Sequence, residues 1–282
     1  MKRLIVNADD FGLTHGVNRA IAELHRSGSL SSATLMSVAH ATSEAADIAR
    51  ATTSLGVGCH VVLVDGVSAL PSSQLPTLTE PDTGRFRKTL GRFVRDLMLG
   101  KIRPEEVEAE AFAQIDHLRS LGVTPTHVDT HKHTHMFPGV LRPLLRAARQ
   151  AGVKAVRNPF EPAWSLRVTF GAPLLRRTQV HILNRFRHTF LGHVAESRFQ
   201  TTSGSIGVLA TGTLDSEVIR SLLANLPDGT WELVTHPAYN DTDLAAAGTR
   251  LLASRAIELD ALSSIALPPD VELIDFRALS QG

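Results

Sequence analysis

Short apolar runs alternate along the chain with stretches whose apolar residues recur every three or four positions. The short runs predict buried strands at residues 3–8, 30–39, 55–64, 125–131, 153–158, 204–210, 230–236 and 271–277. The longer periodic stretches predict helices at residues 16–27, 41–51, 104–121, 139–151 and 245–263. Strands that alternate with helices favour parallel βα units in one sheet. The pattern therefore predicts an α/β fold, a distorted (β/α) TIM-like barrel of seven or eight strands.

The length of the chain agrees with one such barrel. The 282 residues are close to the roughly 250 of a typical (β/α) barrel. The sequence has no internal repeat and no linker that would divide it, so we expect a single domain over residues 1–282. Two segments break the alternation and are expected to be insertions, at about 65–100 and 162–200.

The second insertion has an unusual composition. Residues 162–195 contain no Asp or Glu, and they include five arginines and four large aromatic residues: Arg167, Arg176, Arg177, Arg185, Arg187, Trp164, Phe170, Phe186 and Phe190. The plainer interpretation is a segment packed on the barrel with a solvated basic face. The alternative is a surface that contacts anionic lipid headgroups. Nucleic acid is not an expected partner, because the net charge of the whole chain is only +1.

Composition bounds the class of protein further. A hydrophobic content of 43% excludes a disordered chain. The single cysteine, Cys59, excludes an internal disulfide framework and Cys-based zinc modules. The N-terminus has no signal-peptide core, and no run approaches the roughly 20 apolar residues of a spanning helix. We therefore expect a cytoplasmic protein, membrane-peripheral if the 162–195 segment binds lipid.

Two adjacent carboxylates follow the first predicted strand. Asp9 and Asp10 would repel each other unless a cation lies beside them, and a divalent metal is the usual solution. The alternative is that one of them caps the helix that begins near Thr14. A cap needs only one oxygen, so the pair favours the metal.

A histidine-rich run, THVDTHKHTH, ends the fourth predicted strand. On an extended chain His131, His133 and His135 would share one face. Three ligands at alternate positions of one strand rarely close around a single ion, so we expect one or two to bind metal. The others would bind substrate or orient ligands, and Asp129 could be a hydrogen-bonding partner behind a ligand. The alternative is a solvated histidine-rich turn.

His60 lies within a predicted strand, and His236 ends another. Each alone could be an ordinary core histidine. However, Asp9, Asp10, His131 and His236 all fall at the C-terminal ends of predicted parallel strands, which form the active-site face of a barrel. His60 becomes a candidate for the same rim, whereas its neighbour Cys59 would point to the opposite face. Such a set fits hydrolysis by metal-activated water, with one carboxylate as base and one histidine as acid.

Four segments in this order resemble the YdjC-like carbohydrate deacetylases: NADDFG, GVGCHVVL, DTHKHTH and ELVTHPAY. The resemblance runs from residue 3 to about residue 258. Further similarity in LVDGVSALP, in GRFR at 84–87 and in RNPFEP at 157–162 resembles the hopanoid biosynthesis-associated branch of that family.

The resemblance implies a distorted barrel, one divalent metal ion (Zn, Mg, Mn or Co) and removal of an N-acetyl group from an amino sugar. It implies metal ligation by Asp10, His60 and His131, with Asp9 as base and His236 as acid. It assigns His133, His135, Arg157 and Tyr239 to substrate binding. A homodimer is usual for the family. Arg255 and Glu258 resemble part of a family helix, either as an ion pair that positions the site or as a surface pair three residues apart.

The branch implies a lipid-linked substrate, an N-acetylglucosaminyl hopanoid. Three alternatives remain open at this point: deacetylation of soluble chitooligosaccharides, a metal-dependent sugar isomerase or epimerase, and a glycolipid-binding protein without catalysis. The presence of both Asp9 and His236 favours hydrolysis over binding, since binding alone would need neither.

Overall fold

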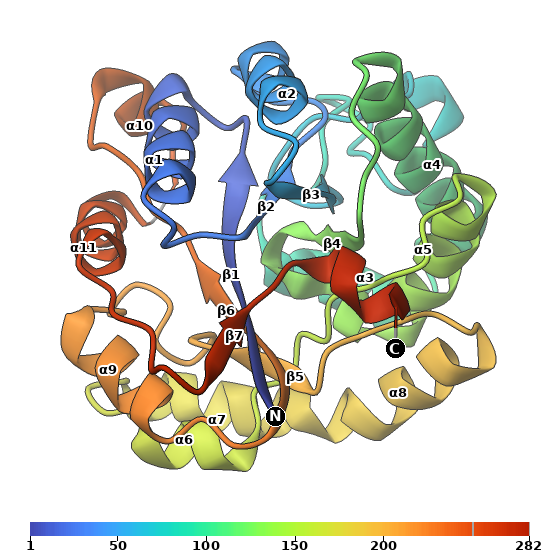
Figure 1. Cartoon of the computed structure of the whole chain (residues 1–282). Helices are drawn as coiled ribbons and strands as arrows, with labels where there is room; N and C mark the ends of the chain where they lie inside the picture. The colour runs from blue at the N-terminus through green and yellow to red at the C-terminus, as the bar shows by residue number, and fades with distance from the viewer. Residues whose placement is uncertain (250, 282) are drawn as a thin grey trace.

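The centre of the protein is a parallel sheet, described here from a computed structural model that covers residues 1–249 and 251–281. Its strands are β1 (Lys2–Phe11), β2 (Ser32–Leu35), β3 (Gly56–Val61), β4 (Val128–Thr130), β5 (Gly204–Ile206), β6 (Gly229–Thr235) and β7 (Val271–Leu273). They run in the order β4-β3-β2-β1-β6-β5. β7 and β2 share one edge of β1, because β7 pairs with its first residues and β2 with its last. Figure 1 shows the helices arranged around this sheet.

The sheet curls but does not close with regular strands. Beyond β4 it continues through single bridges, Val128 to Val156 and Ala155 to Gln200, toward the segment that leads into β5. The prediction of a single-domain α/β fold is confirmed, and the curled parallel sheet agrees with a distorted barrel that is not fully closed. The strand predicted at 153–158 is reduced to these bridges, since Pro159 follows at once and has no N–H for a ladder.

Four predicted helices are found as α1 (His15–Arg26), α2 (Thr42–Ala51), α4 (Pro104–Ser120) and α5 (Pro138–Gln150). A further helix, α9 (Ser216–Ala224), is not predicted by the sequence pattern. The first insertion contains η1 (Ser72–Gln74) and α3 (Leu90–Met98), and the second contains α6 (Ala163–Val168), α7 (Leu174–Leu183), η3 (Asn184–Phe186) and α8 (Arg187–Glu196). The helix predicted at 245–263 is divided into α10 (Thr242–Ala246) and α11 (Leu252–Ser263). Gly248, with φ of 67°, lies between them, and position 250 lies outside the described residues.

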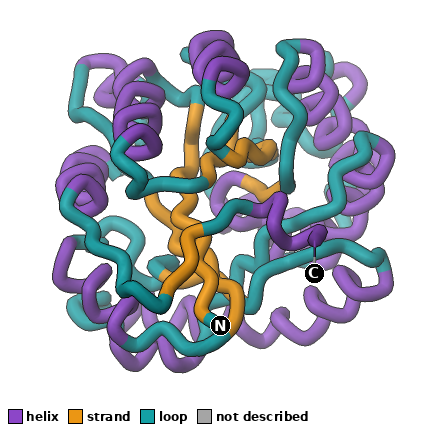
Figure 2. Tube along the Cα trace, viewed as in Figure 1, coloured by secondary structure: helices purple, strands orange, loops and turns teal. Residues whose placement is uncertain are grey.

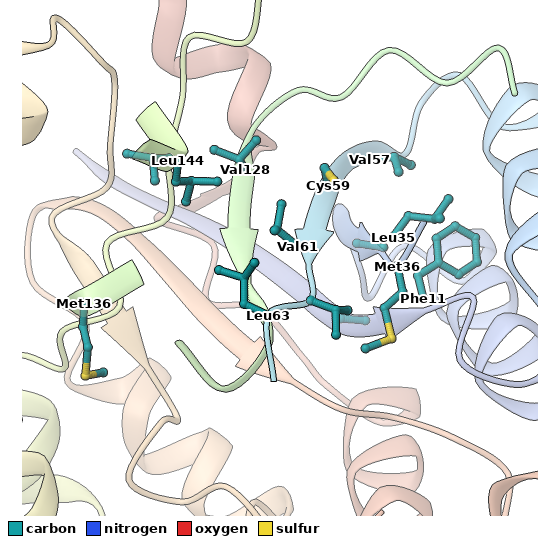
Figure 3. Close-up of a cluster of buried hydrophobic side chains, with 14 of the residues drawn as sticks. Phe11, Leu35, Met36, Val57, Cys59, Val61, Leu63, Val128, Met136 and Leu144 are labelled. Atoms are coloured by element: carbon teal, nitrogen blue, oxygen red, sulfur yellow. The ribbon is translucent and has the colours of Figure 1, made fainter. Parts of the chain in front are cut away.

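Side chains on the two faces of β1 go to different layers. Leu4, Val6 and Ala8 join the large apolar cluster between the sheet and the helices. Figure 3 shows part of this cluster, with Cys59 of β3 and Val128 of β4, so Cys59 does point away from the site as predicted. The helices that complete this layer surround the strands in Figure 2.

The opposite face of β1 is apolar at its start and polar at its end. Ile5 packs with Phe276 of the C-terminal 3-10 helix η4 (Phe276–Gln281), which fills the N-terminal end of the curled sheet. The ring of His127 stacks on Phe276 with 3.5 Å between centroids. Asn7 and Asp9 follow Ile5 at the period of two that a strand imposes. The apolar plug thus closes one end of the sheet and leaves the other for polar side chains.

Among the described residues, no helix combines the length and the apolar character that crossing a bilayer requires.

Gly58 of β3 allows the His127 ring to lie against the sheet. A Cβ atom at Gly58 would come within 2.4 Å of the ring. We expect Gly58→Ala to lower the free energy of unfolding by about 1–3 kcal/mol through overpacking. Gly91→Ala is the matched control, because a Cβ there meets open space in α3, and it should be neutral or slightly stabilising. Urea denaturation measures both, and equal midpoints would refute the packing argument.

Candidate metal centre and active site

The end of β1 is distorted so that two adjacent carboxylates reach one region. The register between β1 and β2 shifts between Ala8 and Phe11, and Asp10 has a φ of 62°. In a regular strand neighbouring side chains point to opposite faces. The bulge and the left-handed residue place Asp9 and Asp10 both beside His60. Neither aspartate caps α1, because the N-cap of this helix is Thr14.

Asp10, His60 and His131 form a compact donor set. Oδ1 of Asp10 lies 3.5 Å from Nε2 of His60 and 3.2 Å from Nδ1 of His131. One ligand atom of each residue lies within 4.8 Å of the other two. Oδ1 of Asp10 is buried, and within the described chain it has no hydrogen bond of good geometry. One carboxylate oxygen and two imidazole nitrogens so arranged fit a divalent ion, and partly exposed His131 leaves the site open on one side.

Asp129 fixes the orientation of the His60 ring. Nδ1 of His60 lies 2.8 and 2.9 Å from the two oxygens of Asp129, which leaves Nε2 directed toward Asp10. A carboxylate behind a histidine is a common arrangement at metal sites, and it selects which nitrogen binds. Burial alone would lower the pKa of His60, but Asp129, Asp9 and Asp10 raise it to about 10. The carboxylates therefore favour positive charge at this point.

Arg157 lies beneath the site and connects three strands. Its guanidinium is fully buried and donates to both oxygens of Asp9, at 2.7 and 2.9 Å, and to Asp129 and Glu232. The assignment of Arg157 to substrate binding is therefore wrong, because its hydrogen bonds are taken up by carboxylates. Burial alone would raise the pKa of Asp9, but Arg157, His60 and His236 hold it far below its ordinary range. Asp9 remains ionised in a buried position.

His236 follows β6 and lies beside Asp9. Its Nε2 is 3.7 Å from Oδ2 of Asp9, and its backbone N–H donates to Glu258. Burial lowers the pKa of His236 to about 4, against the opposing influence of Asp9 and Asp10. The ring is therefore neutral near pH 7, and it can accept a proton before it donates one.

Helix α11 reaches both halves of the site. Arg255 donates to Oδ2 of Asp10, and Glu258 accepts from the backbone of His236. Both side chains are buried. The alternative of a surface pair is therefore wrong, because each residue holds a different member of the site.

The histidine run is not extended. Residues His131–Met136 form the 3-10 helix η2, with left-handed φ values at Lys132 and His133. Thr130 imposes this turn, since its hydroxyl accepts the backbone N–H of His135 at 2.9 Å. The three histidines consequently do not share one face.

The histidines of this run occupy three environments. His131 joins Asp10, and partly exposed His133 has a buried Nδ1 for which the described residues offer no partner. His135 is fully buried, with Nδ1 2.8 Å from the Thr130 hydroxyl and Nε2 3.2 Å from the Arg157 carbonyl. The expectation that His135 contacts substrate is thus wrong, and His133 remains a candidate.

Tyr239 also lies away from the site. Its hydroxyl donates to Glu23 of α1, and the Arg19 guanidinium lies 4.3 Å from its ring centroid. After Pro237 the chain turns outward along α1, where the Tyr239 N–H donates to the Gly16 carbonyl. Its expected role in substrate binding is therefore wrong.

The sequence reading missed several supporting residues. Glu232 of β6 binds Arg157, and Asn7 and Thr34 both donate to Oδ1 of Asp9. One signal was available for Glu232. A charged residue in the middle of the apolar run TWELVT must have a buried partner.

Several aromatic and basic side chains of the 162–195 segment pack against the rest of the protein instead of facing solvent. Phe190 is buried, Phe186 packs on Phe137, and Trp164 packs on Trp231. Arg176 donates to the backbone carbonyl of Val208, and Arg177 donates to those of Leu166 in α6 and of Thr169 just after it. The exposed large apolar residues of the segment are Phe170, Leu174, Leu175 and Ile182.

Comparison with known proteins gives consistent matches over the whole chain. The profile of the YdjC-like protein family matches residues 3–272. A carbohydrate deacetylase of Brevibacillus brevis is 33% identical, over 98% of this chain and 99% of the relative. One of Geobacillus stearothermophilus is 31% identical, over 97% and 96%. A solved structure from Enterococcus faecalis V583, provisionally described as a cellobiose-phosphate cleavage protein, is 25% identical, with a TM-score of 0.80 over 99% of this chain and 98% of that chain.

Loss of Arg157 should destabilise the protein strongly. Arg157→Met would leave Asp9, Asp129 and Glu232 buried without their counter-charge, so we expect a loss of about 3–5 kcal/mol. Arg146→Met is the control, because Arg146 forms a half-exposed pair with Glu108 and should cost at most about 1 kcal/mol. Chemical denaturation gives both values. Similar losses in the two variants would contradict the role of Arg157.

Glu258 should make stability fall as the pH rises. Burial raises the pKa of Glu258 from 4.5 to about 7, so the folded protein holds a proton that the unfolded chain releases between these values. Its contribution to the free energy of unfolding therefore decreases across this window, by at most about 1.4 kcal/mol per pH unit. Glu258→Gln should flatten the pH dependence of urea midpoints there. Parallel curves for the two proteins would exclude this titration.

Proposed function

Because the chain belongs to the YdjC-like protein family, we propose that it is a metal-dependent carbohydrate deacetylase, which hydrolyses the N-acetyl group of an amino sugar. The observation that carries the proposal is the donor set of Asp10, His60 and His131 beside the ionised Asp9 and the neutral His236. The carbohydrate deacetylase activity of its Brevibacillus and Geobacillus relatives supports it.

Asp10, His60 and His131 would hold one divalent ion, for which Zn²⁺, Mg²⁺, Mn²⁺ and Co²⁺ are all suitable with mixed nitrogen and oxygen ligands. Such an ion, when bound, supplies a Lewis acid that acidifies water and polarises a carbonyl group. Asp129 and Arg255 keep the ligands in place, the first through Nδ1 of His60 and the second through Oδ2 of Asp10.

Asp9 and His236 would move the protons of the reaction. Asp9 accepts a proton from the attacking water while Arg157 holds its carboxylate in one orientation. His236, 3.7 Å away, is neutral at rest, so it can receive this proton and deliver it to the amide nitrogen. The water oxygen bonds to the carbonyl carbon, the amide nitrogen takes up the relayed proton, and the C–N bond breaks to give acetic acid and the amine, which leave near pH 7 as acetate and a protonated amine.

We propose that the sugar is attached to a lipid, as in an N-acetylglucosaminyl hopanoid. The branch-specific sequence segments support this substrate. The surface of α7 supports it as well, because Leu174 and Leu175 are 82% and 71% exposed in a segment free of acidic residues. A hollow of about 370 Å³ lies between α7, the loop at 209–213 and the start of α11, and it includes Ser254, the neighbour of Arg255. This hollow, at the start of α11, offers a place for the lipid part.

The substrate can be tested by acetate release from metal-reconstituted protein. We expect release from an N-acetylglucosaminyl hopanoid. Release from N,N′-diacetylchitobiose alone would keep the chemistry and replace the lipid substrate with a soluble oligosaccharide. No release from either, with each of the four metals, would overturn the deacetylase proposal in favour of a sugar isomerase or a binding protein.

Asp9→Asn should reduce the turnover number by about 10²–10⁴-fold, the range for loss of a general base. Substrate binding and metal content should change little, since Asp9 is not one of the proposed ligands. Asp116→Asn on the exposed face of α4 is the control. Steady-state acetate release gives the rates, and unchanged turnover in Asp9→Asn would remove Asp9 from the mechanism.

The exposed leucines of α7 should be required for membrane contact. We expect the double substitution Leu174→Ser and Leu175→Ser to reduce co-sedimentation with anionic vesicles, because it removes the apolar side chains that would enter the interface. Leu99→Ser is the matched control, since Leu99 is 62% exposed at the end of α3. Equal sedimentation of both variants and the unmodified protein would exclude this surface.

A further inference from the structure

A second group of metal-ligating side chains lies on the surface near the start of α1. It consists of His15 at the first position of α1, His40 in the loop after β2, and Asp243 in α10. One nitrogen or oxygen of each lies within 4.8 Å of the other two. The rings of His15 and His40 meet edge to face, with 5.6 Å between centroids. Figure 1 shows α10 and α2 on either side of α1, so three separate segments meet here.

Glu44 holds the His15 ring in one orientation. Nδ1 of His15 lies 2.8 Å from Oε2 of Glu44, and Asn18 donates to the same oxygen at 2.6 Å. Nδ1 is thereby occupied and Nε2 is left as the nitrogen that can bind an ion. This is the arrangement that Asp129 gives His60 in the first site, a carboxylate behind a ligating histidine. Asn18 also accepts the Gly12 N–H at 2.8 Å, which ties the group to the turn that follows Asp10.

The segment that carries Asp243 is seated closely on α1. Tyr239 donates to the Gly16 carbonyl, and a Cβ atom at Gly16 would come within 2.2 Å of Oδ2 of Asp241. Gly16 therefore permits a contact that a larger residue would prevent. The position of Asp243 opposite the two histidines follows from this contact.

We propose that His15, His40 and Asp243 bind a second divalent ion, of the kind that takes mixed imidazole and carboxylate ligands, with Zn²⁺ the best fit. The ion joins α1, the loop after β2 and α10. Both histidines are exposed, so water completes the coordination and the site fills and empties with the ion concentration. α10 follows His236 by only a few residues, so a bound ion fixes the outer end of the segment that begins at His236.

The number of zinc ions bound per chain tests this site. Calorimetric titration and elemental analysis with Zn²⁺ should give two equivalents for the unmodified protein and one for His15→Gln, His40→Gln and Asp243→Asn. His117→Gln, at an exposed position of α4, is the control and should keep two. If the first site bound no metal, the unmodified protein would bind one equivalent and the three variants would bind none. This proposal and the proposed function therefore fail separately. Undiminished zinc binding in His40→Gln would overturn the second site.

The contribution of Glu44 gives an independent readout. Glu44→Gln should keep the second equivalent but weaken it about 10- to 100-fold, as expected when the partner behind a ligating histidine is lost. Glu44 raises the pKa of His15, so proton competition for this nitrogen should weaken as the titration is carried out at higher pH. Zinc should also raise the thermal midpoint of Asp10→Asn, a variant of the first site, and this rise should disappear when His40→Gln is added. A rise that persists in the double variant would overturn the proposal.

Discussion

The buried guanidinium of Arg157 is the interaction on which the site depends. It compensates carboxylates from β1, β4 and β6, which would otherwise repel one another in a place without water. Because of it, Asp9 remains ionised, Asp129 keeps its orientation toward His60, and Glu232 can lie inside a strand. Arg255 does the same for Asp10 from the opposite side. Four carboxylates thus face two guanidinium groups, namely Asp9, Asp10, Asp129 and Glu232 against Arg157 and Arg255. The pKa values of Asp9, Asp10 and Asp129 are lowered, whereas burial raises that of Glu232 to about 7. The three ionised aspartates outnumber the two guanidinium groups, and this excess negative charge suits a divalent cation.

The two ends of the curled sheet differ in chemical character. At one end Ile5, His127 and Phe276 form an apolar plug that gives rigidity without polar chemistry. At the other end the same strands carry the polar set, supported from outside by α11. This helix holds a proposed ligand and a proposed acid at once, through Arg255 and Glu258. A small movement of α11 would therefore change both the donor set and the proton-transferring group.

The sequence was informative where a polar residue ends an apolar strand. Asp9, Asp10 and His236 could be placed on one rim because parallel strands bring their C-terminal ends together. It was uninformative where a tertiary contact decides. Arg157 and Tyr239 resemble pocket residues until their partners are known, and these partners include Asp9 and Glu23, which are 148 and 216 positions away along the chain. The period-two pattern could not predict the turn at Lys132 and His133, because a hydrogen bond to the Thr130 hydroxyl determines this turn. The predicted strand at 153–158 does not form as a regular strand, because this segment pairs only through isolated bridges.

The left-handed backbone at Asp10 restricts how this protein could evolve a different metal preference. A φ of 62° is adopted most readily by Gly, Asn, Asp and His, whereas a β-branched or long side chain costs on the order of 1–3 kcal/mol there. Exchange of Asp10 for Glu, the obvious route to a longer carboxylate donor, is therefore penalised by the main chain before any ion is considered. His60 and His131 have ordinary backbone conformations and carry no such penalty. Divergence in metal choice should accordingly proceed through the histidines, with the aspartate as the fixed point around which the ligand set varies.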